Sequence, residues 1–244
     1  MNVLIVFAHN EPRSFNAAMK DASVEVLTNA GHDVVVSDLY AMGFNPVASA
    51  ADFGERANPD YLVYALEQRK AYESGTLAAD IAGEVEKVKK ADLIIFNFPI
   101  YWYGMPAIMK GWVDRVFISG LCYGGKRIYD RGGLKGKSAL LAFSLGGQPH
   151  MFGPGAIHGE LEVMLQPLLR GMLAYVGLTV LPPYAAYHVP YLAAEARAEI
   201  LDGYRRHLLT LDQRAPLRFP SMDDFDENLR PKSPANEFAP TSKT

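Results

Sequence analysis

Aromatic residues gather in one short stretch of this chain, directly after a run of apolar residues. Residues 93–98 are nearly continuously apolar, Pro99 ends the run, and Ile100 to Gly104 then holds two tyrosines and a tryptophan. Flat rings attract one another in offset or edge-to-face arrangements, so this loop is suited to a flat aromatic ligand. An aromatic plug beneath a surface loop explains the same pattern equally well.

Two neighbouring glycines, Gly146 and Gly147, follow a second apolar run that spans residues 137–145. Because glycine has no side chain, the backbone N–H groups of such a pair can approach a ligand closely. An ordinary turn is the alternative interpretation of this pair.

A polar loop, residues 9–13, separates the first apolar run of the chain from Ser14. Serine is a typical N-cap residue, so a helix is predicted to begin there. Free N–H groups and the positive end of the helix dipole favour phosphate at such a place. The G-x-G-x-x-G pattern of dinucleotide-binding loops is absent, so a plain helix cap is the alternative. His9 alone is typical of a hydrogen-bonded structural histidine.

Apolar runs alternate with amphipathic stretches along the chain, which predicts parallel strands joined by helices. The strands are predicted at residues 2–8, 32–38, 93–98, 137–145 and 178–181. The helices are predicted from Ser14 onward and at residues 61–75, 80–90, 106–117, 159–176 and 193–212. This order is typical of a doubly wound α/β sheet, in which ligands bind at loops that follow the carboxyl ends of strands.

Length and composition set the size of the domain and exclude several partners. The chain has 244 residues, of which 49% are hydrophobic, and a net charge of −3. We assign residues 1–213 to one domain and residues 214–244 to a C-terminal extension, whose last 15 or so residues have a composition typical of disorder. The small net charge gives no reason to expect nucleic acid or an anionic membrane as a partner.

The single cysteine, Cys122, excludes an internal disulfide and a multi-cysteine metal site, and we expect no metal. We expect Cys122 to be a small apolar filler in a protein of the reducing cytoplasm. No signal-peptide pattern and no apolar run of about 20 residues is present, so membrane insertion is not expected.

Four separated motifs carry a resemblance to a known family. In chain order they are H-N-E-P-R-S-F-N, S-D-L-Y-A-M-G-F-N-P, F-P-I-Y-W-Y-G-M-P-A-I-M-K-G-W and G-G-Q-P-H-M-F-G-P-G-A-I-H-G. Together they resemble the NAD(P)H:quinone oxidoreductases of the DT-diaphorase type, from about residue 2 to about residue 220. The resemblance implies a flavodoxin-like α/β fold with a five-stranded parallel sheet in the order 2-1-3-4-5.

The resemblance also implies an activity, the two-electron reduction of quinones by NADPH or NADH. Hydride would pass in a ping-pong reaction through N5 of one flavin, while the protein supplies position and charge. FAD is favoured over FMN, because the motifs at both ends of the cofactor resemble the FAD-binding branch. In the family the active unit is a homodimer with its site at the subunit interface.

Matching the family motifs position by position implies a set of site residues. The implied cofactor-binding residues are His9, Arg13, Ser14, Phe15, Asn16, Ala17, Pro99, Ile100, Tyr101, Trp102, Tyr103, Ser144, Leu145, Gly146, Gly147, Phe152, Val189, Arg197 and Leu201. The implied substrate-binding residues are Trp102, Tyr103, Tyr123, Ile128, Met151 and His158. The implied catalytic residues are His158 as proton donor, Tyr123 as a lid over the substrate, and Gly146 and Gly147 as N–H donors to the reduced flavin.

Some positions depart from the family pattern. Arg13 and Leu145 replace threonines, and Gly125 and Ile128 replace a tyrosine and a methionine. Glycine lacks the side chain that would cover the substrate and restrains the backbone less than other residues do. We therefore expect a more open or more flexible lid over the substrate.

Phe152 stands where the family has a tyrosine paired with the histidine, and phenylalanine cannot donate a proton. Three explanations are open at this point. His158 works alone with water, Tyr123 or Tyr129 substitutes for the missing tyrosine, or the proton step does not limit turnover.

Other functions fit the same sequence. An azoreductase or nitroreductase of the same fold would share nearly all of these positions. An ancillary regulatory subunit of a potassium-efflux system would use flavin for binding instead of turnover. A flavodoxin-like protein without a cofactor is disfavoured by the intact aromatic loop and the glycine pair.

Overall fold

The structure is a computed structural model, and it describes residues 1–233. The strands are β1 (Asn2–Phe7), β2 (Asp33–Asp38), β3 (Leu93–Pro99), β4 (Ser138–Ser144), β5 (Thr179–Val180) and β6 (Tyr184–Ala186). The helices are α1 (Phe15–Asn29), α2 (Tyr64–Ser74), α3 (Ala79–Lys90), α4 (Ala107–Val116), α5 (Leu161–Met164), α6 (Gln166–Leu168) and α7 (Ala194–Leu208). Short helical turns are η1 (Ala50–Asp52), η2 (Tyr129–Arg131), η3 (Pro149–Met151), η4 (Leu169–Ala174), η5 (Val189–Tyr191), η6 (Leu211–Gln213) and η7 (Met222–Asp224).

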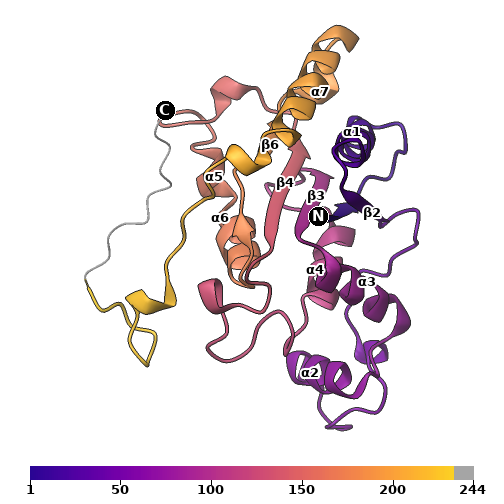
Figure 1. Cartoon of the computed structure of the whole chain (residues 1–244), viewed down its shortest axis with the longest axis vertical. Coiled ribbons are helices and arrows are strands. Elements are labelled where there is room, and N and C mark those ends of the chain that lie inside the picture. Colours follow the sequence, from indigo (N-terminus) through magenta and orange to yellow (C-terminus); the bar gives the residue numbers. More distant parts are fainter. Residues whose placement is uncertain (234–244) are drawn as a thin grey trace.

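The strands form one parallel sheet through the middle of the molecule (Figure 1). Its order is β2-β1-β3-β4-β5, which confirms the predicted flavodoxin-like arrangement, and β6 also pairs with β4. Phe7 of β1 pairs with Asn97 of β3, and Pro99 of β3 pairs with Ser144 of β4. The loops that follow β1, β3 and β4 therefore meet at the carboxyl edge of the sheet.

The fifth position of the sheet is divided between two short strands, where the sequence predicted one strand at residues 178–181. β5 pairs with the first residues of β4, and β6 pairs with its last residues. Pro182 and Pro183 lie between them, and proline has no N–H to donate to a strand ladder. Strand β6 brings the chain back to the carboxyl edge.

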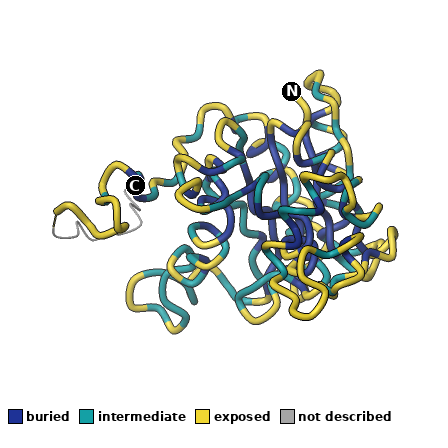
Figure 2. Tube along the Cα trace, turned by 90° about the horizontal axis from the view of Figure 1, so that it is seen from below, coloured by how far each residue is buried: buried dark blue, intermediate teal, exposed yellow. Residues whose placement is uncertain are grey.

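Helices cover both faces of the sheet, so the central strands are buried on both sides (Figure 2). Helices α1 and α7 pack on one face, where Met19 and Tyr204 belong to one apolar core. Helices α3 and α4 pack on the other face, where Val85 and Trp112 belong to a second core. Each fully buried side chain of this size contributes about 1.5–3 kcal/mol to stability.

The predicted helix at residues 159–176 is wrong as one regular element. The chain there forms α5, α6 and the π-helical turn η4 instead. Pro167 lies in α6 and cannot donate the hydrogen bond that a continuous helix requires, so the helix is interrupted at this point. Leu165, Leu169 and Leu173 are buried in the core, while Leu161 and Leu168 are half-buried against it.

The described part of the C-terminal extension follows the outer edge of the sheet. The Leu217 N–H donates to the Val180 carbonyl of β5. The Asp130 carboxylate accepts hydrogen bonds from the Ser221 hydroxyl and the Met222 N–H. The predicted disorder concerns residues that lie mostly outside the described range. Within residues 1–233, no helix combines the length and the apolar character needed to cross a membrane.

A buried histidine on α7 ties stability to pH. His207 is only 7% exposed, and its ring lies 5.1 Å from the ring of Tyr184. Its Nε2 atom is buried and has no hydrogen-bond partner in the described part of the chain. Burial, and then the neighbouring charge of Arg214, lower the pKa of His207 from 6.5 to about 4. Neutral His207 is therefore the form that the fold accepts.

Acidification is expected to destabilise the fold through this residue. Between pH 6.5 and about 4 the unfolded chain binds a proton that folded His207 does not, so the free energy of unfolding falls as pH falls. The contribution of neutral His207 to the free energy of unfolding is complete above pH 6.5. Because each pKa unit corresponds to about 1.36 kcal/mol, about 3 kcal/mol is lost once the pH falls below the folded pKa of about 4. Urea unfolding of His207→Gln at pH 7 and pH 4.5 should show a smaller pH dependence than wild type. His150→Gln, which changes an exposed histidine, serves as the control, and equal pH dependences for all three proteins would contradict this account.

Candidate functional site

A large cavity opens beside the N-terminus of α1 at the carboxyl edge of the sheet. Its volume is about 590 Å³, and we call it the α1 cavity. Its lining residues are His9, Arg13, Ser14, Phe15, Asn16, Ala18, Pro99, Tyr101, Ser144, Val189, Pro190 and Arg197. Ten of these were predicted as cofactor contacts. They come from the ends of β3 and β4, from the loops after β1, β3 and β6, and from α1 and α7. The structure therefore brings together residues that lie far apart in the sequence.

The N-terminus of α1 is prepared to accept an anion. Ser14 caps the helix as predicted, and its Oγ accepts the Ala17 N–H at 3.1 Å. The N–H groups of Phe15 and Asn16 have no acceptor among the described residues. Unpaired N–H groups at a helix start, together with the helix dipole, form a ready seat for a phosphate group. This fits the predicted binding of a cofactor that carries phosphate.

His9 and Arg13 flank this seat in different ways. The Nδ1 atom of His9 accepts the Glu11 N–H at 2.9 Å, so this nitrogen carries no proton. Burial is the main cause that lowers the pKa of His9, while Glu11 acts in the opposite direction. Arg13 has a side chain that is 91% exposed, and its Nε contacts the Glu11 carboxylate at 3.3 Å. The guanidinium is therefore held at the rim of the cavity, in solvent.

A buried polar network connects the strands behind the α1 cavity. The Asn16 amide donates to the Asn97 Oδ1 at 3.0 Å, and the Ser144 hydroxyl donates to the Asn16 Oδ1 at 2.6 Å. The Asn97 amide donates back to the Asn16 carbonyl. These bonds fix α1, β3 and β4 relative to one another, because a broken bond would leave a buried polar atom unpaired. Asn97 was missed in the sequence, although a lone asparagine inside an apolar strand was a visible signal.

The aromatic loop after β3 is a tight hairpin. The Tyr101 N–H donates to the Gly104 carbonyl, and the Gly104 N–H donates to the Tyr101 carbonyl. Between them, Trp102 and Tyr103 have φ angles of 52° and 56°, in the left-handed region that side chains rarely adopt. Two such residues define a type I′ turn, which normally holds asparagine or glycine. Strain of this kind persists where the surroundings enforce it, which is common at ligand sites.

This hairpin presents its aromatic side chains to solvent. The Trp102 side chain is 99% exposed, and Tyr101 is 48% exposed. The interpretation of the loop as a buried aromatic plug is therefore wrong. Exposed rings on a strained turn are suited to cover a flat ligand.

A smaller cavity of about 210 Å³ adjoins the hairpin, and we call it the histidine cavity. Its lining residues are Ile100, Trp102, Tyr103, Leu145, Gly146, Gly147, Phe152 and His158. All eight were predicted as cofactor-binding or substrate-binding residues. The cavity is bounded by the hairpin on one side and by the glycine pair on the other.

The glycine pair offers hydrogen-bond donors to this cavity. The N–H groups of Gly146 and Gly147 have no acceptor among the described residues. A Cβ atom on Gly147 would lie 2.8 Å from Cε2 of Phe152, which is closer than real Cβ contacts allow. A side chain at Gly147 would therefore clash with Phe152 unless that ring moved.

His158 lies between two aromatic rings. Its ring centroid is 5.1 Å from that of Phe152 and 5.9 Å from that of Tyr103. Neither ring nitrogen has a hydrogen-bond partner among the described residues, so both are available to a ligand. Phe152 thus does stand next to His158, and it supplies packing where a tyrosine would supply a hydroxyl.

Some predicted residues lie outside both cavities. Tyr123 lines a third cavity of about 330 Å³ between α4 and the segment 167–176. Ile128 is buried, while Leu201 packs against the core below α7. Ala17 is buried behind the Ser14 cap, and the Met151 Sδ accepts the Gln148 N–H beside the histidine cavity. Within one chain, the structure therefore does not bring Tyr123 or Ile128 to His158.

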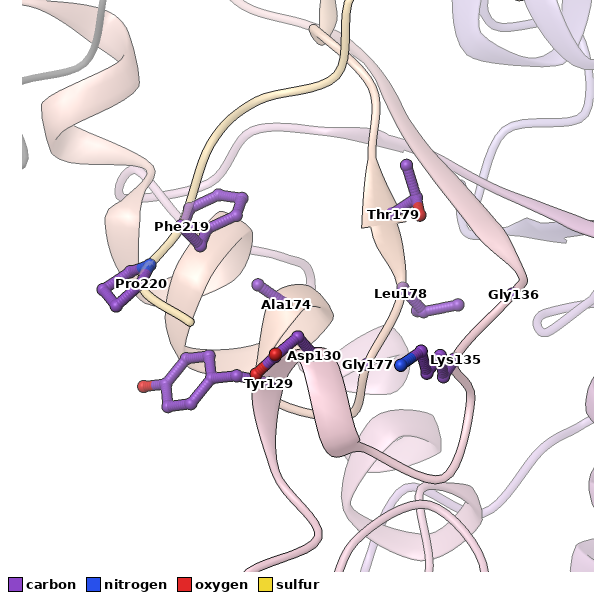
Figure 3. A pocket seen from close by; sticks show the side chains of 10 residues that line it. All are labelled: Tyr129, Asp130, Lys135, Gly136, Ala174, Gly177, Leu178, Thr179, Phe219 and Pro220. Carbon is purple, nitrogen blue, oxygen red and sulfur yellow. The ribbon is translucent and has the colours of Figure 1, made fainter. Parts of the chain in front are cut away.

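Tyr129 lies in a further cavity of about 230 Å³, which Figure 3 shows. Lys135 and Thr179 contribute to the same cavity, close to the amino ends of β4 and β5. This is the opposite edge of the sheet from the histidine cavity. Tyr129 of the same chain therefore does not replace the missing tyrosine beside His158.

The loop that carries Tyr123 is held by several hydrogen bonds. Arg127 donates to the carbonyls of Gly120 and Leu121, at 3.0 Å and 2.9 Å. The Gly120 N–H donates to the Tyr123 carbonyl. The prediction of a more open or flexible lid did not take these bonds into account. Cys122 in the same loop is buried, and burial raises the pKa of its thiol to about 12, in keeping with the predicted apolar filler.

Comparisons with known proteins identify relatives of this chain. A family model described as a flavodoxin-like fold matches residues 1–210. The chain is 42% identical over 228 residues to NAD(P)H dehydrogenase (quinone) 1 of Rattus norvegicus, covering 93% of this chain and 83% of the relative. It is 40% identical over 216 residues to the ribosyldihydronicotinamide dehydrogenase (quinone) of Homo sapiens, covering 88% and 94%. The solved structure of a candidate quinone reductase from Klebsiella pneumoniae has a TM-score of 0.90 and 37% identity, covering 100% of this chain and 97% of that one.

Proposed function

The chain belongs to the flavodoxin-like family that includes the NAD(P)H dehydrogenases of quinones, and on this premise we propose that it reduces quinones with NAD(P)H. Two electrons would pass from the reduced nicotinamide to the quinone through a bound flavin. The relatives support this activity over most of their length, and the site described above supports the flavin.

The observation that carries the proposal is the arrangement of the two cavities around one edge of the sheet. Both are lined by the loop after β3 and by the chain that follows β4. The α1 cavity offers unpaired N–H groups at a helix start, which suit phosphate. The histidine cavity offers aromatic rings, unpaired glycine N–H groups and a free histidine, which suit a flat ring that gains negative charge. A flavin nucleotide has these two parts.

The residues that line the two cavities are chemically suited to this group. Phe15 and Asn16 would hold phosphate with their N–H groups, and Trp102 and Tyr103 would flank the flat ring. A flavin bound there would supply the two-electron hydride-transfer chemistry between the nicotinamide and the quinone. Gly146 and Gly147 would donate hydrogen bonds to the edge of the ring that becomes negative. His158 would donate a proton from a ring nitrogen to the quinone oxygen.

The cofactor is FAD in this proposal. The α1 cavity continues past the helix start to Val189, Pro190 and Arg197, which an FMN-sized molecule would not need. The Arg197 guanidinium donates to the Leu192 carbonyl at 3.1 Å and lines the cavity. An arginine at this end is suited to the phosphate or the adenine of a dinucleotide.

The active unit in this proposal is a homodimer. Tyr123 lines the third cavity together with apolar residues of the segment 167–176, such as Leu168 and Met172. A second chain seated against this face would bring its own Tyr123 near the site of the first chain, as the family resemblance implies. The proposed compartment is the cytoplasm, where a free thiol such as that of Cys122 stays reduced.

Two other activities are less well supported. An azoreductase or nitroreductase would use the same cavities, and rates on a panel of acceptors would separate it from a quinone reductase. An ancillary regulator of potassium efflux would bind flavin without efficient turnover. The two relatives named above are both quinone dehydrogenases, and this chain matches 83% and 94% of their lengths. This favours a quinone as the electron acceptor.

An anaerobic visible spectrum tests the proposal. The purified protein should show bound flavin, NADPH should bleach it, and menadione should restore it. Extraction of the flavin separates FAD from FMN, and sedimentation gives the number of chains. Flavin that NADPH fails to bleach would favour the regulatory function. A protein that binds no flavin on reconstitution would refute the proposed function altogether.

A further inference from the structure

We propose that His188 is a positioning residue that holds the Gly146–Gly147 peptide in the orientation needed to bind reduced flavin. The inference rests on the proposed function, and it assigns a role to a residue that none of the sequence motifs included. His188 follows β6, the strand that the sequence analysis missed.

His188 makes hydrogen bonds to both carbonyls of the glycine pair. Its backbone N–H donates to the Gly147 carbonyl at 2.9 Å. Its side-chain Nδ1 lies 3.0 Å from the Gly146 carbonyl oxygen. A carbonyl oxygen can only accept, so Nδ1 carries the proton in this contact. The two bonds extend the pairing of β4 and β6, in which the Leu145 N–H donates to the Ala186 carbonyl.

The side-chain bond fixes the direction of one N–H group. Gly146 C=O and Gly147 N–H belong to the same peptide, and the described chain holds no cis peptide. In a trans peptide these two groups point in opposite directions. A donor that holds the Gly146 carbonyl on one side therefore aims the Gly147 N–H to the other side. Gly146 and Gly147 line the histidine cavity, and His188 does not.

The same bond makes the Gly147 N–H a better donor. A hydrogen bond accepted by the carbonyl of a peptide polarises the N–H of that peptide, which strengthens the bond that the N–H makes. Glycines at both positions leave this peptide free to rotate unless something holds it. The Gly147 N–H has no acceptor within the described chain, so its bond is reserved for a ligand.

The backbone of His188 shows what this position requires. Its φ angle is 57°, in the left-handed region, where asparagine, aspartate and histidine are the most frequent residues after glycine. Its ring also lies 5.0 Å from the ring of Tyr191, which keeps the imidazole in place beside Gly146. Strain at a residue whose side chain makes one specific contact is consistent with a functional role.

The experiment compares two substitutions that both tolerate this backbone. His188→Gly keeps the backbone N–H bond and removes the side-chain donor. His188→Asn restores a donor, because the Asn Nδ2 is as many bonds from Cα as the His Nδ1. His150→Gly, at an exposed histidine of the neighbouring loop, is the control. Each holoenzyme is checked for an unchanged circular dichroism spectrum and for the dissociation constant and the midpoint potential of its flavin.

We expect His188→Gly to bind oxidised flavin nearly as well as wild type and reduced flavin up to tenfold more weakly. A tenfold loss of preference for the reduced form lowers a two-electron midpoint potential by about 30 mV. His188→Asn should lie within about twofold of wild type. Equal potentials for wild type and His188→Gly would overturn the proposal. Equal losses of affinity for reduced flavin in His188→Gly and His188→Asn would overturn it too. The effect would then come from loss of the imidazole ring and not from loss of the hydrogen-bond donor.

A second measurement does not depend on the variants. The ¹⁵N spectrum of labelled histidine in the holoenzyme should show His188 with its proton on Nδ1. A proton on Nε2 alone would overturn the inference while leaving the proposed function intact. If the wild-type protein bound no flavin, the proposed function and this inference would both fall.

Discussion

Replacing His158 with alanine is expected to slow quinone reduction about 100-fold while leaving the flavin bound. The ring nitrogens of His158 are free of protein partners, and the ring is held between Phe152 and Tyr103. A positioned proton donor contributes about 10²–10⁴-fold to a rate. We expect the lower end, because Phe152 adds no second donor to the pair. Stopped-flow measurement of the two half-reactions locates the loss in the reoxidation by quinone.

Two comparisons make this prediction specific. His150→Ala removes an exposed histidine eight positions earlier and should leave both half-reactions unchanged. Phe152→Tyr places a hydroxyl on the ring beside His158 and should change quinone reduction while keeping the flavin. An unchanged rate and pH profile in His158→Ala would remove this histidine from the mechanism. Loss of flavin in Phe152→Tyr would show that this ring contacts the cofactor differently.

The carboxyl edge of the sheet could be predicted because its pattern is local. Each of the three ligand loops follows a long apolar run, and buried parallel strands produce such runs wherever they occur. The motif match then placed Phe152 beside His158, and the ring distance of 5.1 Å agrees with it. Their roles toward a cofactor are still predictions.

The features that sequence analysis missed depend on short or irregular elements. β6 has three residues and follows two prolines, so it shows no periodicity, and His188 went unnoticed with it. The helix at 159–176 was wrong for the opposite reason. Apolar residues keep helical spacing across Pro167, although the hydrogen-bond ladder of a regular helix is interrupted there. The spacing alone therefore predicted one continuous helix.

The position of Tyr123 depends on packing between distant segments. Its ring lies 5.8 Å from that of Tyr175, and the third cavity that it lines shares no lining residue with the histidine cavity. The motif match assigns Tyr123 to an active site, but it does not say whether that site belongs to the same chain or to the partner chain. The third cavity, where Tyr123 meets Leu168 and Met172, is therefore the surface on which the homodimer proposal depends.

A buried ion pair near the end of α4 is expected to have the largest effect on stability. Arg115 and Asp52 have side chains that are 3% and 2% exposed. The Arg115 guanidinium donates to both carboxylate oxygens of Asp52, to Asp80 at 2.6 Å and to the Asn45 carbonyl at 2.8 Å. Burial alone would raise the pKa of Asp52, yet hydrogen bonds from Arg115 and Tyr64 hold this pKa below its usual value. The carboxylate is therefore charged in the fold and depends on its partners.

Replacing Arg115 with methionine should lower the free energy of unfolding by about 3–5 kcal/mol, because it leaves a buried carboxylate without its main partner. Arg115→Lys should recover only part of this loss, since lysine cannot form the two parallel bonds. Lys110 and Asp114 form an exposed pair on the same helix, so Lys110→Met is the matched control and should cost under about 1 kcal/mol. Urea unfolding followed by circular dichroism measures all three variants. Equal losses of unfolding free energy in Arg115→Met and Lys110→Met would contradict this account. The buried network would then not be what holds the segment around Asp52 against α4, the helix that follows the aromatic hairpin.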